Sequence, residues 1–436
     1  MPQLQQKLTL FDMTMIAIGS TIGSGIFLTP SSIAKALPSP FWILLVWVLG
    51  GLMALSGALT FAELGARMPG VGGVYVYLRE AYGGLVGFLY GWAYFLVVNT
   101  GGIAALSVAF ATYFGYFVPL TPAGIKIAAI IGLIIVTVIN VLGVKAGGVF
   151  SDIFTVLKLV GIAGLIVVGL GWGTSATADF TFALGDLSNG LGSALAVAMV
   201  GVLWSYGGWQ HATFLAAEAK DARRTIPLAM ILGAFAVTLI YLLTNVAYMF
   251  LLSPQQIGNS SRVAAEAVGV ILGPIGASLI ALAIFISTFG TTGIYTLTAP
   301  RIYYAMANDG VFFNKVAEVH PRFHTPALAI LFQSVWAVVL ILFWGTFENL
   351  ISYVVFTDWI FFALAAASVF IFRQRAIAGS YKTFGYPLTP LFFVATSIWF
   401  IVNTLIEKPA QAWAGLGFLA FGVPVYYFWK TQRRRL

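Results

Sequence analysis

The sequence predicts an all-α integral membrane protein with twelve transmembrane helices in a single domain. Only 8% of its 436 residues are charged and 60% are hydrophobic, whereas a soluble domain carries about 25% charged residues. Charge-free stretches of roughly 20 residues, enough to cross a bilayer as a helix, recur along the chain. These long apolar blocks exclude a transmembrane β-barrel, whose strands alternate in polarity over about ten residues.

The composition also excludes several classes of function. So few charges cannot form the polar shell of a soluble enzyme, a disordered chain or a nucleic-acid binder. The net charge of +8 is typical of a membrane protein with basic cytoplasmic loops. The chain has no cysteine and only three histidines, His211, His320 and His324. We therefore expect no disulfide, metal site, cofactor or catalytic thiol. The first apolar run contains glycines and has no signal-peptide pattern.

Eleven charge-free runs and one interrupted run give the twelve predicted spans. The interrupted run is 349–372, which contains Asp358. The run 81–125 is long enough for two helices, but a single helix followed by a turn at 119–122 keeps the charge pattern consistent. The other predicted spans are 13–34, 36–62, 127–144, 159–178, 187–217, 225–261, 267–300, 323–347, 383–406 and 409–429.

The distribution of basic residues predicts the topology. Cytoplasmic loops of membrane proteins are enriched in Lys and Arg. If both termini are cytoplasmic, seventeen of the 22 basic residues lie inside and Lys158 lies within the membrane. The outer segments then hold only Lys35, Lys126, Arg262 and Lys408. The sequence therefore predicts a multi-pass protein of the cell membrane with cytoplasmic termini.

Two spans contain glycine clusters in the middle. Residues 18–27 read Ile-Gly-Ser-Thr-Ile-Gly-Ser-Gly-Ile-Phe, and residues 203–209 read Leu-Trp-Ser-Tyr-Gly-Gly-Trp. The clusters lie five helices apart, and an odd offset gives them opposite orientations, as an inverted repeat requires. We expect repeats at 10–172 and 188–373, followed by two additional helices at 387–431.

The glycine clusters are the candidate binding site. Unwound backbone within a membrane must line a cavity or be buried in protein. The N-terminus of a half-helix suits a carboxylate, and free carbonyls at a half-helix C-terminus suit an ammonium group. A pair of breaks therefore suits a zwitterionic amino acid. The alternative is close helix packing through small residues, which the spacing of Gly19 and Gly23 also fits.

Motifs along nearly the whole chain resemble the amino acid–polyamine–organocation superfamily. Within it, the chain resembles the L-type amino acid transporter family and its bacterial relatives. No single motif is specific to this family, but the order and spacing of the motifs together are specific to it. The motif residues are 23–27, 62–65 with Met68 and Pro69, 75–80, 152–155 with Lys158 and Leu159, 205–209, 226–229, 241–245, 299–301 and 320–322. Val74 departs from the pattern, because the family usually has an acid there.

The resemblance implies a leucine-transporter-like fold of five-plus-five inverted repeats, discontinuous helices 1 and 6, and alternating access. It also implies a substrate site in the two breaks. Backbone N–H groups of Ser24 and Gly25 would hold the carboxylate, and carbonyls near Ile18, Gly19 and Trp204 the amino group. The Trp204 ring would close the site from outside. The remaining expected site residues are Thr21, Ser205 and Gly207, which would face the substrate side chain, together with Gly23 and Tyr206.

Lys158 is a basic residue at membrane depth, where a charge is costly unless it is paired or snorkels to the surface. Snorkelling is possible if the helix begins near Ser151. The resemblance instead implies that the ammonium group takes the place of sodium in sodium-coupled relatives. It would then contact the broken helix 1 and the eighth span near Ser287 and Thr288. In this interpretation, Lys158 and Ser287 belong to the gating and coupling residues.

Asp358 and Tyr241 complete the expected coupling residues. Asp358 stands where the family usually has Asn. It could be protonated, paired with a cation or exposed to the outer vestibule, and the structural alternative is a neutral, hydrogen-bonded carboxyl. The resemblance suggests that the Tyr241 hydroxyl stabilises the substrate-bound state, and the alternative is aromatic packing. We expect His211 to be a structural residue.

Other charges have structural interpretations. Glu63 and Arg67 are four residues apart and should form an ion pair at a helix end. Asp12 and Asp152 should cap helix N-termini. The run 433–435 is three arginines that would meet anionic lipid at the inner leaflet.

These features predict secondary-active, sodium-independent transport of neutral L-amino acids, as an exchanger (antiporter). The alternatives are proton-coupled uptake, or an amine or polyamine carrier in which Asp358 holds the cation. The resemblance also bears on partners, because animal members of the family form a disulfide with a heavy chain through a cysteine. This chain has no cysteine and cannot form that bond. We therefore expect a monomer or weak homo-oligomer that contacts only substrate and lipid. Neither nucleic-acid binding nor an enzymatic reaction is expected.

Overall fold

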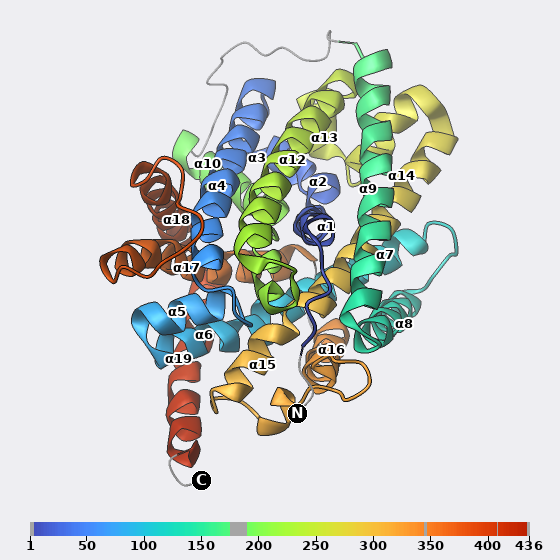
Figure 1. Ribbon diagram of the computed structural model, residues 1–436. Helices are drawn as coiled ribbons and strands as arrows, with labels where there is room; N and C mark the ends of the chain where they lie inside the picture. Colours follow the sequence, from blue (N-terminus) through green and yellow to red (C-terminus); the bar gives the residue numbers. More distant parts are fainter. Residues whose placement is uncertain (1–3, 175–189, 344–346, 408, 434–436) are drawn as a thin grey trace.

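The computed structural model describes residues 4–174, 190–343, 347–407 and 409–433. Within these ranges the secondary structure is helical, apart from one isolated bridge between Leu8 and Ala219. The first and last described residues lie toward the same end of the helical bundle (Figure 1). Lys408, Arg434, Arg435 and the start of the second predicted repeat at 188 lie outside the described residues.

Ten helical segments in the described ranges are long and apolar enough to cross a membrane. Two shorter apolar helices, α10 (Leu191–Tyr206) and α16 (Ala327–Phe343), occupy two further predicted spans. This is the architecture of a multi-pass membrane protein. The long segments are formed by α1 (Leu10–Thr21) with α2 (Gly25–Leu28), α4 (Pro40–Arg67), α6 (Gly84–Ala93) with the π-helix η1 (Tyr94–Val98) and α7 (Asn99–Phe114), α8 (Pro122–Val141), α9 (Val144–Trp172), α12 (Ala222–Leu251), α14 (Val263–Thr298) with α15 (Pro300–Asn308), α17 (Phe347–Gln374), α18 (Leu388–Glu407) and α19 (Pro409–Arg433).

The long predicted run 81–125 holds one long apolar helical segment among the described residues, as expected. Helical backbone continues from Gly84 to Phe114 through a short π-helical stretch. The chain then turns, and the Thr121 side chain accepts a hydrogen bond from the backbone N–H of Gly124 at 3.1 Å. This is an N-cap at the start of α8.

The predicted start of the fifth span is wrong. The helix α9 begins at Val144 and not near Ser151. Gly143, at φ 143°, adopts a conformation open mainly to glycine and sets the earlier start. Asp152 consequently lies eight residues inside the helix and cannot be its N-cap.

The predicted capping role of Asp12 is correct in kind but shifted in position. The N-cap of α1 is Thr9, and Asp12 is the third residue of the helix. The Thr9 N–H donates to the Asp12 carboxylate at 2.5 Å, and the Asp12 N–H donates to the Thr9 hydroxyl at 3.3 Å. This reciprocal pair is a capping box.

The helix α1 lies at the centre of the bundle (Figure 1). It packs against α12, α9 and α14, while α12 also packs along α4, and α14 along α7. The last six residues of α1, 16–21, are all buried. Short helices at the bundle ends connect the long ones: α3 (Pro30–Ala36), α5 (Val74–Tyr82), α11 (His211–Phe214), the 3₁₀-helix η3 (Ala216–Glu218), α13 (Pro254–Asn259) and the 3₁₀-helix η4 (Asn314–Ala317).

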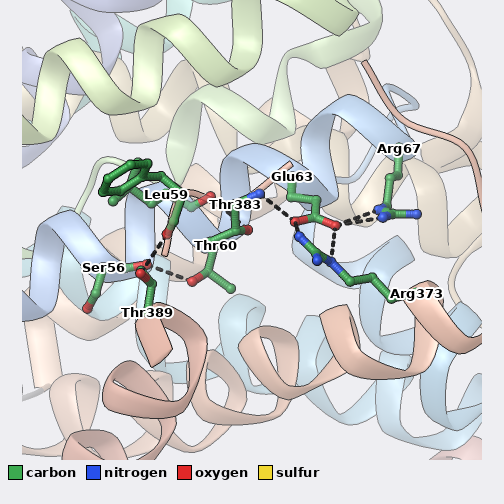
Figure 2. Close-up of polar contacts among 9 residues, drawn as sticks. Ser56, Leu59, Thr60, Glu63, Arg67, Arg373, Thr383 and Thr389 are labelled. Atoms are coloured by element: carbon green, nitrogen blue, oxygen red, sulfur yellow. Dashed lines mark hydrogen bonds and ion pairs between the residues drawn. The ribbon is translucent and has the colours of Figure 1, made fainter. Parts of the chain in front are cut away.

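The predicted pair of Glu63 and Arg67 is confirmed and belongs to a larger cluster (Figure 2). The buried Glu63 carboxylate accepts hydrogen bonds from Arg67 at 2.6 Å, from Arg373 at 2.7 Å and from the backbone N–H of Thr383 at 2.6 Å. Thr383 precedes α18 and Arg373 lies at the end of α17. One carboxylate therefore ties the end of α4 to two elements far away in sequence, with charge-assisted bonds.

Candidate substrate site

The first span is broken where its glycine cluster predicted. The helix α1 ends at Thr21, Ile22 leaves the helical conformation at φ −79° and ψ 88°, and α2 begins at Gly25. No described residue accepts a hydrogen bond from the backbone N–H groups of Ser24 or Gly25. These amides therefore remain available to an anionic ligand.

The sixth span is broken at the same level. The helix α10 ends at Tyr206, Gly207 is extended at ψ 144°, Gly208 has φ 132°, and helix resumes at His211. The positive φ strongly favours glycine at position 208. A side-chain carbon there would also lie 2.5 Å from the backbone carbon of Ser20 in the first break.

The two breaks are in direct contact at two points. The Ser20 hydroxyl lies 2.8 Å from the carbonyl of Gly208 and 2.6 Å from the carbonyl of Ile16, and it donates its one hydrogen to one of them at a time. On the other side, a side-chain carbon on Gly25 would lie 2.6 Å from the Cα atom of Ser205. Glycine is needed at both points because backbone meets backbone. The close packing considered as an alternative is therefore real, and it is what brings the two breaks together.

A small cavity of about 10 Å³ lies between the breaks. This volume is about that of one water molecule, so an amino acid requires the helices to separate. Six of the expected site residues line the cavity: Thr21, Gly23, Ser24, Gly25, Trp204 and Gly207. The Trp204 ring N–H donates to the Ser24 hydroxyl at 3.3 Å, which connects the sixth span with the first.

The other expected substrate residues do not line this cavity. The Tyr206 hydroxyl donates to the carbonyl of Trp47 at 3.0 Å, so its ring faces α4. The Ser205 hydroxyl donates to the carbonyl of Gly201 at 2.8 Å within its own helix. Both side chains satisfy their polar groups with protein instead of facing the cavity.

The carbonyls expected to hold the amino group already accept protein donors. The Ile18 carbonyl accepts the N–H of Ile22 at 2.8 Å, and the Trp204 carbonyl accepts the N–H of Gly207 at 3.3 Å. The Gly19 carbonyl accepts the Lys158 ammonium at 2.9 Å. These three oxygens are therefore engaged with protein donors in the described arrangement.

Sequence reasoning missed four residues of the cavity wall. Ser20 lies within the predicted break, but only the fold shows that its side chain reaches the second break. Thr291 and Tyr295 are four residues apart on α14 and share one helix face. The hydroxyl-rich sequence around them in an apolar span was an available signal. Nothing in the sequence distinguishes Leu106, which completes the wall.

Lys158 does not snorkel. Its side chain is fully buried, and its ammonium group donates to the carbonyls of Gly19 at 2.9 Å and Ile22 at 2.7 Å and to the hydroxyl of Thr291 at 2.7 Å. The contact with the first break is as expected. The contact on α14 is one turn from the predicted position, because the Thr288 hydroxyl donates to Ile284 within its own helix.

Hydroxyl groups on α14 complete the contacts to the first break. Ser287 donates to the Gly23 carbonyl at 2.9 Å, and the Thr291 hydroxyl lies 2.9 Å from the Gly19 carbonyl. The carbonyls that the break releases are thus bound by one ammonium group and two hydroxyls. Since buried carbonyls require donors, these residues stabilise the break and tie it to α9 and α14.

Tyr241 on α12 connects the two breaks. Its buried hydroxyl lies 3.0 Å from the carbonyl of Thr21 and 3.0 Å from the carbonyl of Ser205. A hydroxyl has one hydrogen, so it donates to one carbonyl at a time. The Tyr241 ring also contacts Trp47 and Tyr206, so this residue takes part in aromatic packing as well as in these polar contacts.

Asp358 lies in a second small cavity beside the first. This side cavity of about 30 Å³ shares Trp204, Gly207 and Tyr295 with the cavity between the breaks. The Asp358 Oδ1 and the Asn99 Oδ1 are buried and accept no hydrogen bond from a described residue. A carboxyl group therefore borders the cavity between the breaks.

His211 also lines the side cavity, but its ring nitrogens have partners. Nδ1 lies 2.5 Å from the Thr298 hydroxyl and Nε2 lies 3.2 Å from the Tyr94 hydroxyl. The ring stacks on Tyr295 with centroids 4.3 Å apart. These contacts agree with the structural role expected for this histidine.

Long apolar helices, two of them broken at the same level around a polar pocket, define a membrane transporter with discontinuous helices. The comparison with known proteins is more specific. The chain belongs to the amino acid permease family, whose model matches residues 8–427. The resemblance predicted from the motifs is thereby confirmed, and members of this family are transporters rather than enzymes.

Individual relatives align over almost the whole chain. The chain is 33% identical over 434 residues to the serine/threonine exchanger SteT of Bacillus subtilis (strain 168), covering 97% of this chain and 96% of the relative. It is 30% identical to the human b(0,+)-type amino acid transporter 1, covering 93% of this chain and 84% of that protein. It is 29% identical to the human large neutral amino acids transporter small subunit 2, covering 98% and 82%.

Proposed function

We propose that this transporter is a sodium-independent, secondary-active exchanger of neutral L-amino acids in the cell membrane. The observation that carries the proposal is the contact between the two helix breaks, with the N–H groups of Ser24 and Gly25 free of protein acceptors. Such a pair of breaks suits the carboxylate and ammonium groups of an amino acid. The names of the relatives, a serine/threonine exchanger among them, support exchange.

The side cavity supports a short substrate side chain that donates a hydrogen bond. Its unpartnered oxygens on Asn99 and Asp358 are acceptors, and its volume of about 30 Å³ suits a small group. No Lys or Arg is among the described residues that line it, which disfavours acidic substrates. A serine or threonine hydroxyl fits these properties. Because the Asp358 carboxyl group could hold a cationic group, an amine or polyamine carrier is the second candidate function.

Lys158 supports independence from sodium. In transporters with broken helices, unwound carbonyls coordinate the coupling cation. Here the Gly19 and Ile22 carbonyls bind the Lys158 ammonium group. A cation fixed to the chain occupies the position that a free cation would need, so substrate binding does not require sodium.

We propose twelve spans with both termini cytoplasmic, and inverted repeats at 10–172 and 188–373 followed by 387–431. The described residues form ten long and two short apolar helices, which supports twelve spans. The first and last described residues lie toward the same end of the bundle (Figure 1), which supports termini on one side of the membrane. Transport then proceeds by alternating access, in which the broken helices move relative to α14. Because the chain has no cysteine, it works without a disulfide-linked subunit, as a monomer or weak homo-oligomer.

Counterflow in proteoliposomes tests the proposed function. With radiolabelled serine outside, unlabelled serine, threonine or alanine inside should accelerate uptake, with no effect of sodium or a pH gradient. Internal putrescine and arginine serve as amine and cationic controls. Absence of counterflow with every amino acid would reject the proposal, acceleration by putrescine alone would favour the amine carrier, and a requirement for a pH gradient would favour proton-coupled uptake.

Tyr241→Phe should lower the exchange rate roughly ten-fold at normal expression. The change removes a hydrogen bond that joins the two breaks, and an unmet buried acceptor costs about 1–3 kcal/mol. Initial exchange rates per unit of membrane protein measure the effect. Tyr82→Phe is the matched control, because its hydroxyl donates to the Leu364 carbonyl at 2.8 Å away from the breaks. Equal rates in the two variants would contradict a role for Tyr241.

Asp358→Asn should retain exchange within about ten-fold and alter the preference among side chains. Asparagine keeps an acceptor oxygen but adds a donor group, so hydroxyl substrates should lose part of their advantage over alanine. Competition between serine and alanine at several pH values measures this. If the substitution instead flattens the pH dependence of uptake, Asp358 carries a proton and the proton-coupled alternative is favoured.

A further inference from the structure

A large polar cavity lies at the bundle end opposite the described termini. Its volume is about 790 Å³, and its lining residues come from α3, the end of α7, the segment between α13 and α14, and α14. The labels of α3 and α13 lie toward the end of the bundle opposite the two marked chain ends (Figure 1). This volume is in the range of about 300–1,000 Å³ that is typical of small-molecule sites. It contrasts with the cavity of about 10 Å³ between the helix breaks.

The charged residues among the described lining are both cations. Lys35 lies on α3 and Arg262 precedes α14, both are exposed, and neither forms an ion pair with a described carboxylate. They are two of the four basic residues that the topology prediction places outside, where basic residues are scarce. The rest of the polar lining consists of hydroxyl and amide groups, among them Ser31 and Ser32 on α3 and Asn259 at the end of α13.

The inner end of this cavity lies close to the helix breaks. Its wall includes Leu28, three residues after Gly25. On α7 its wall includes Val108, two residues after Leu106, which lines the smaller cavity. Less than one helical turn therefore separates the lining residues of the two cavities along each of these segments.

We propose that this outer cavity is an entry site that binds the carboxylate of an incoming amino acid at Lys35 and Arg262. A neutral amino acid is a zwitterion without net charge, so these cations act by direct contact with its carboxylate, which Arg can bind with two parallel bonds. From here the carboxylate passes to the N–H groups of Ser24 and Gly25. The inference rests on the proposed exchange of amino acids and adds a second, weaker site to it.

Neutralising both cations tests the entry site. In intact cells, K35Q/R262Q should lower kcat/KM for external serine about five-fold at low ionic strength, with kcat unchanged. The wild-type kcat/KM should fall as an impermeant salt is added, because salt screens exposed charges, whereas that of the variant should stay nearly constant. K126Q is the matched control, since Lys126 is predicted on the same side but does not line the cavity.

The conservative variant K35R/R262K should restore the wild-type rate and its dependence on salt. If the double neutralisation does not reach the membrane, K35Q and R262Q alone should each give a two- to three-fold loss. Wild-type kcat/KM at every ionic strength in the neutral variants would overturn the entry site. Absence of amino acid exchange in the wild type would instead reject the proposed function, so the two failures are distinguishable.

Discussion

Replacing Lys158 with alanine should reduce amino acid exchange roughly a hundred-fold or more while the protein still reaches the membrane. The ammonium group is buried and donates to Gly19, Ile22 and Thr291. Its removal takes the charged donor from the Gly19 and Ile22 carbonyls and leaves them only the hydroxyls of Thr291 and Ser287. A hydrogen bond to a charged group contributes about 1.5–3 kcal/mol. Because 1.4 kcal/mol is a factor of ten, two such losses would displace the break from its binding-competent geometry.

The measurement is initial serine exchange per unit of purified protein in proteoliposomes. Lys145→Ala is the matched control, since Lys145 is an exposed lysine on the same helix, and it should exchange at the wild-type rate. Thr291→Val removes one hydroxyl at the same point and should cost less than the loss of Lys158. Wild-type exchange by Lys158→Ala would refute the coupling role.

Much of the architecture could be predicted because its physical causes are local in sequence. Length and apolarity define the spans, and glycine clusters define the breaks. The start of α9 could not be predicted from charge, since Lys145 is tolerated at an exposed helix end and Gly143 sets the boundary. Helix ends depend on single backbone conformations, which hydropathy does not encode.

The site was predictable at the level of elements but not of every side chain. The breaks identified Ser24, Gly25 and Trp204 as neighbours, and the contact of Lys158 with the first break followed from the family resemblance. The orientation of Tyr206 toward α4 and the position of Asp358 beside the site depend on how distant helices are rotated against each other. Such rotation follows from tertiary packing, which one sequence does not reveal.

Removing either partner of the ion pair between Glu218 and Arg301 should destabilise the protein by about 3–5 kcal/mol, because it leaves a buried charge uncompensated. Both side chains are fully buried, and the Arg301 guanidinium donates to the two carboxylate oxygens at 2.7 and 2.8 Å. Arg301 also donates to the Leu297 carbonyl. The pair links the segment after α11 to the start of α15.

The backbone of Glu218 adds the N-terminal segment to this connection. Its carbonyl accepts the N–H groups of Lys7 at 2.9 Å and Leu8 at 3.0 Å, and the Leu8 carbonyl accepts the N–H of Lys220 at 2.8 Å. If the broken first and sixth spans move, the N-terminal segment must move with them, or these backbone hydrogen bonds must break. A change at the ion pair should affect exchange as well as stability.

A double-mutant cycle separates the charge from the packing. Glu218→Leu and Arg301→Leu alone should each lower the midpoint of thermal unfolding in detergent sharply, whereas the double variant should lie closer to the wild type, because it leaves no unpaired charge. The mild control is Glu266→Leu, which replaces an exposed acid at the start of α14. If the double variant is as unstable as the sum of the single variants, the pair contributes no coupling energy, and the stability of this region comes from backbone contacts instead.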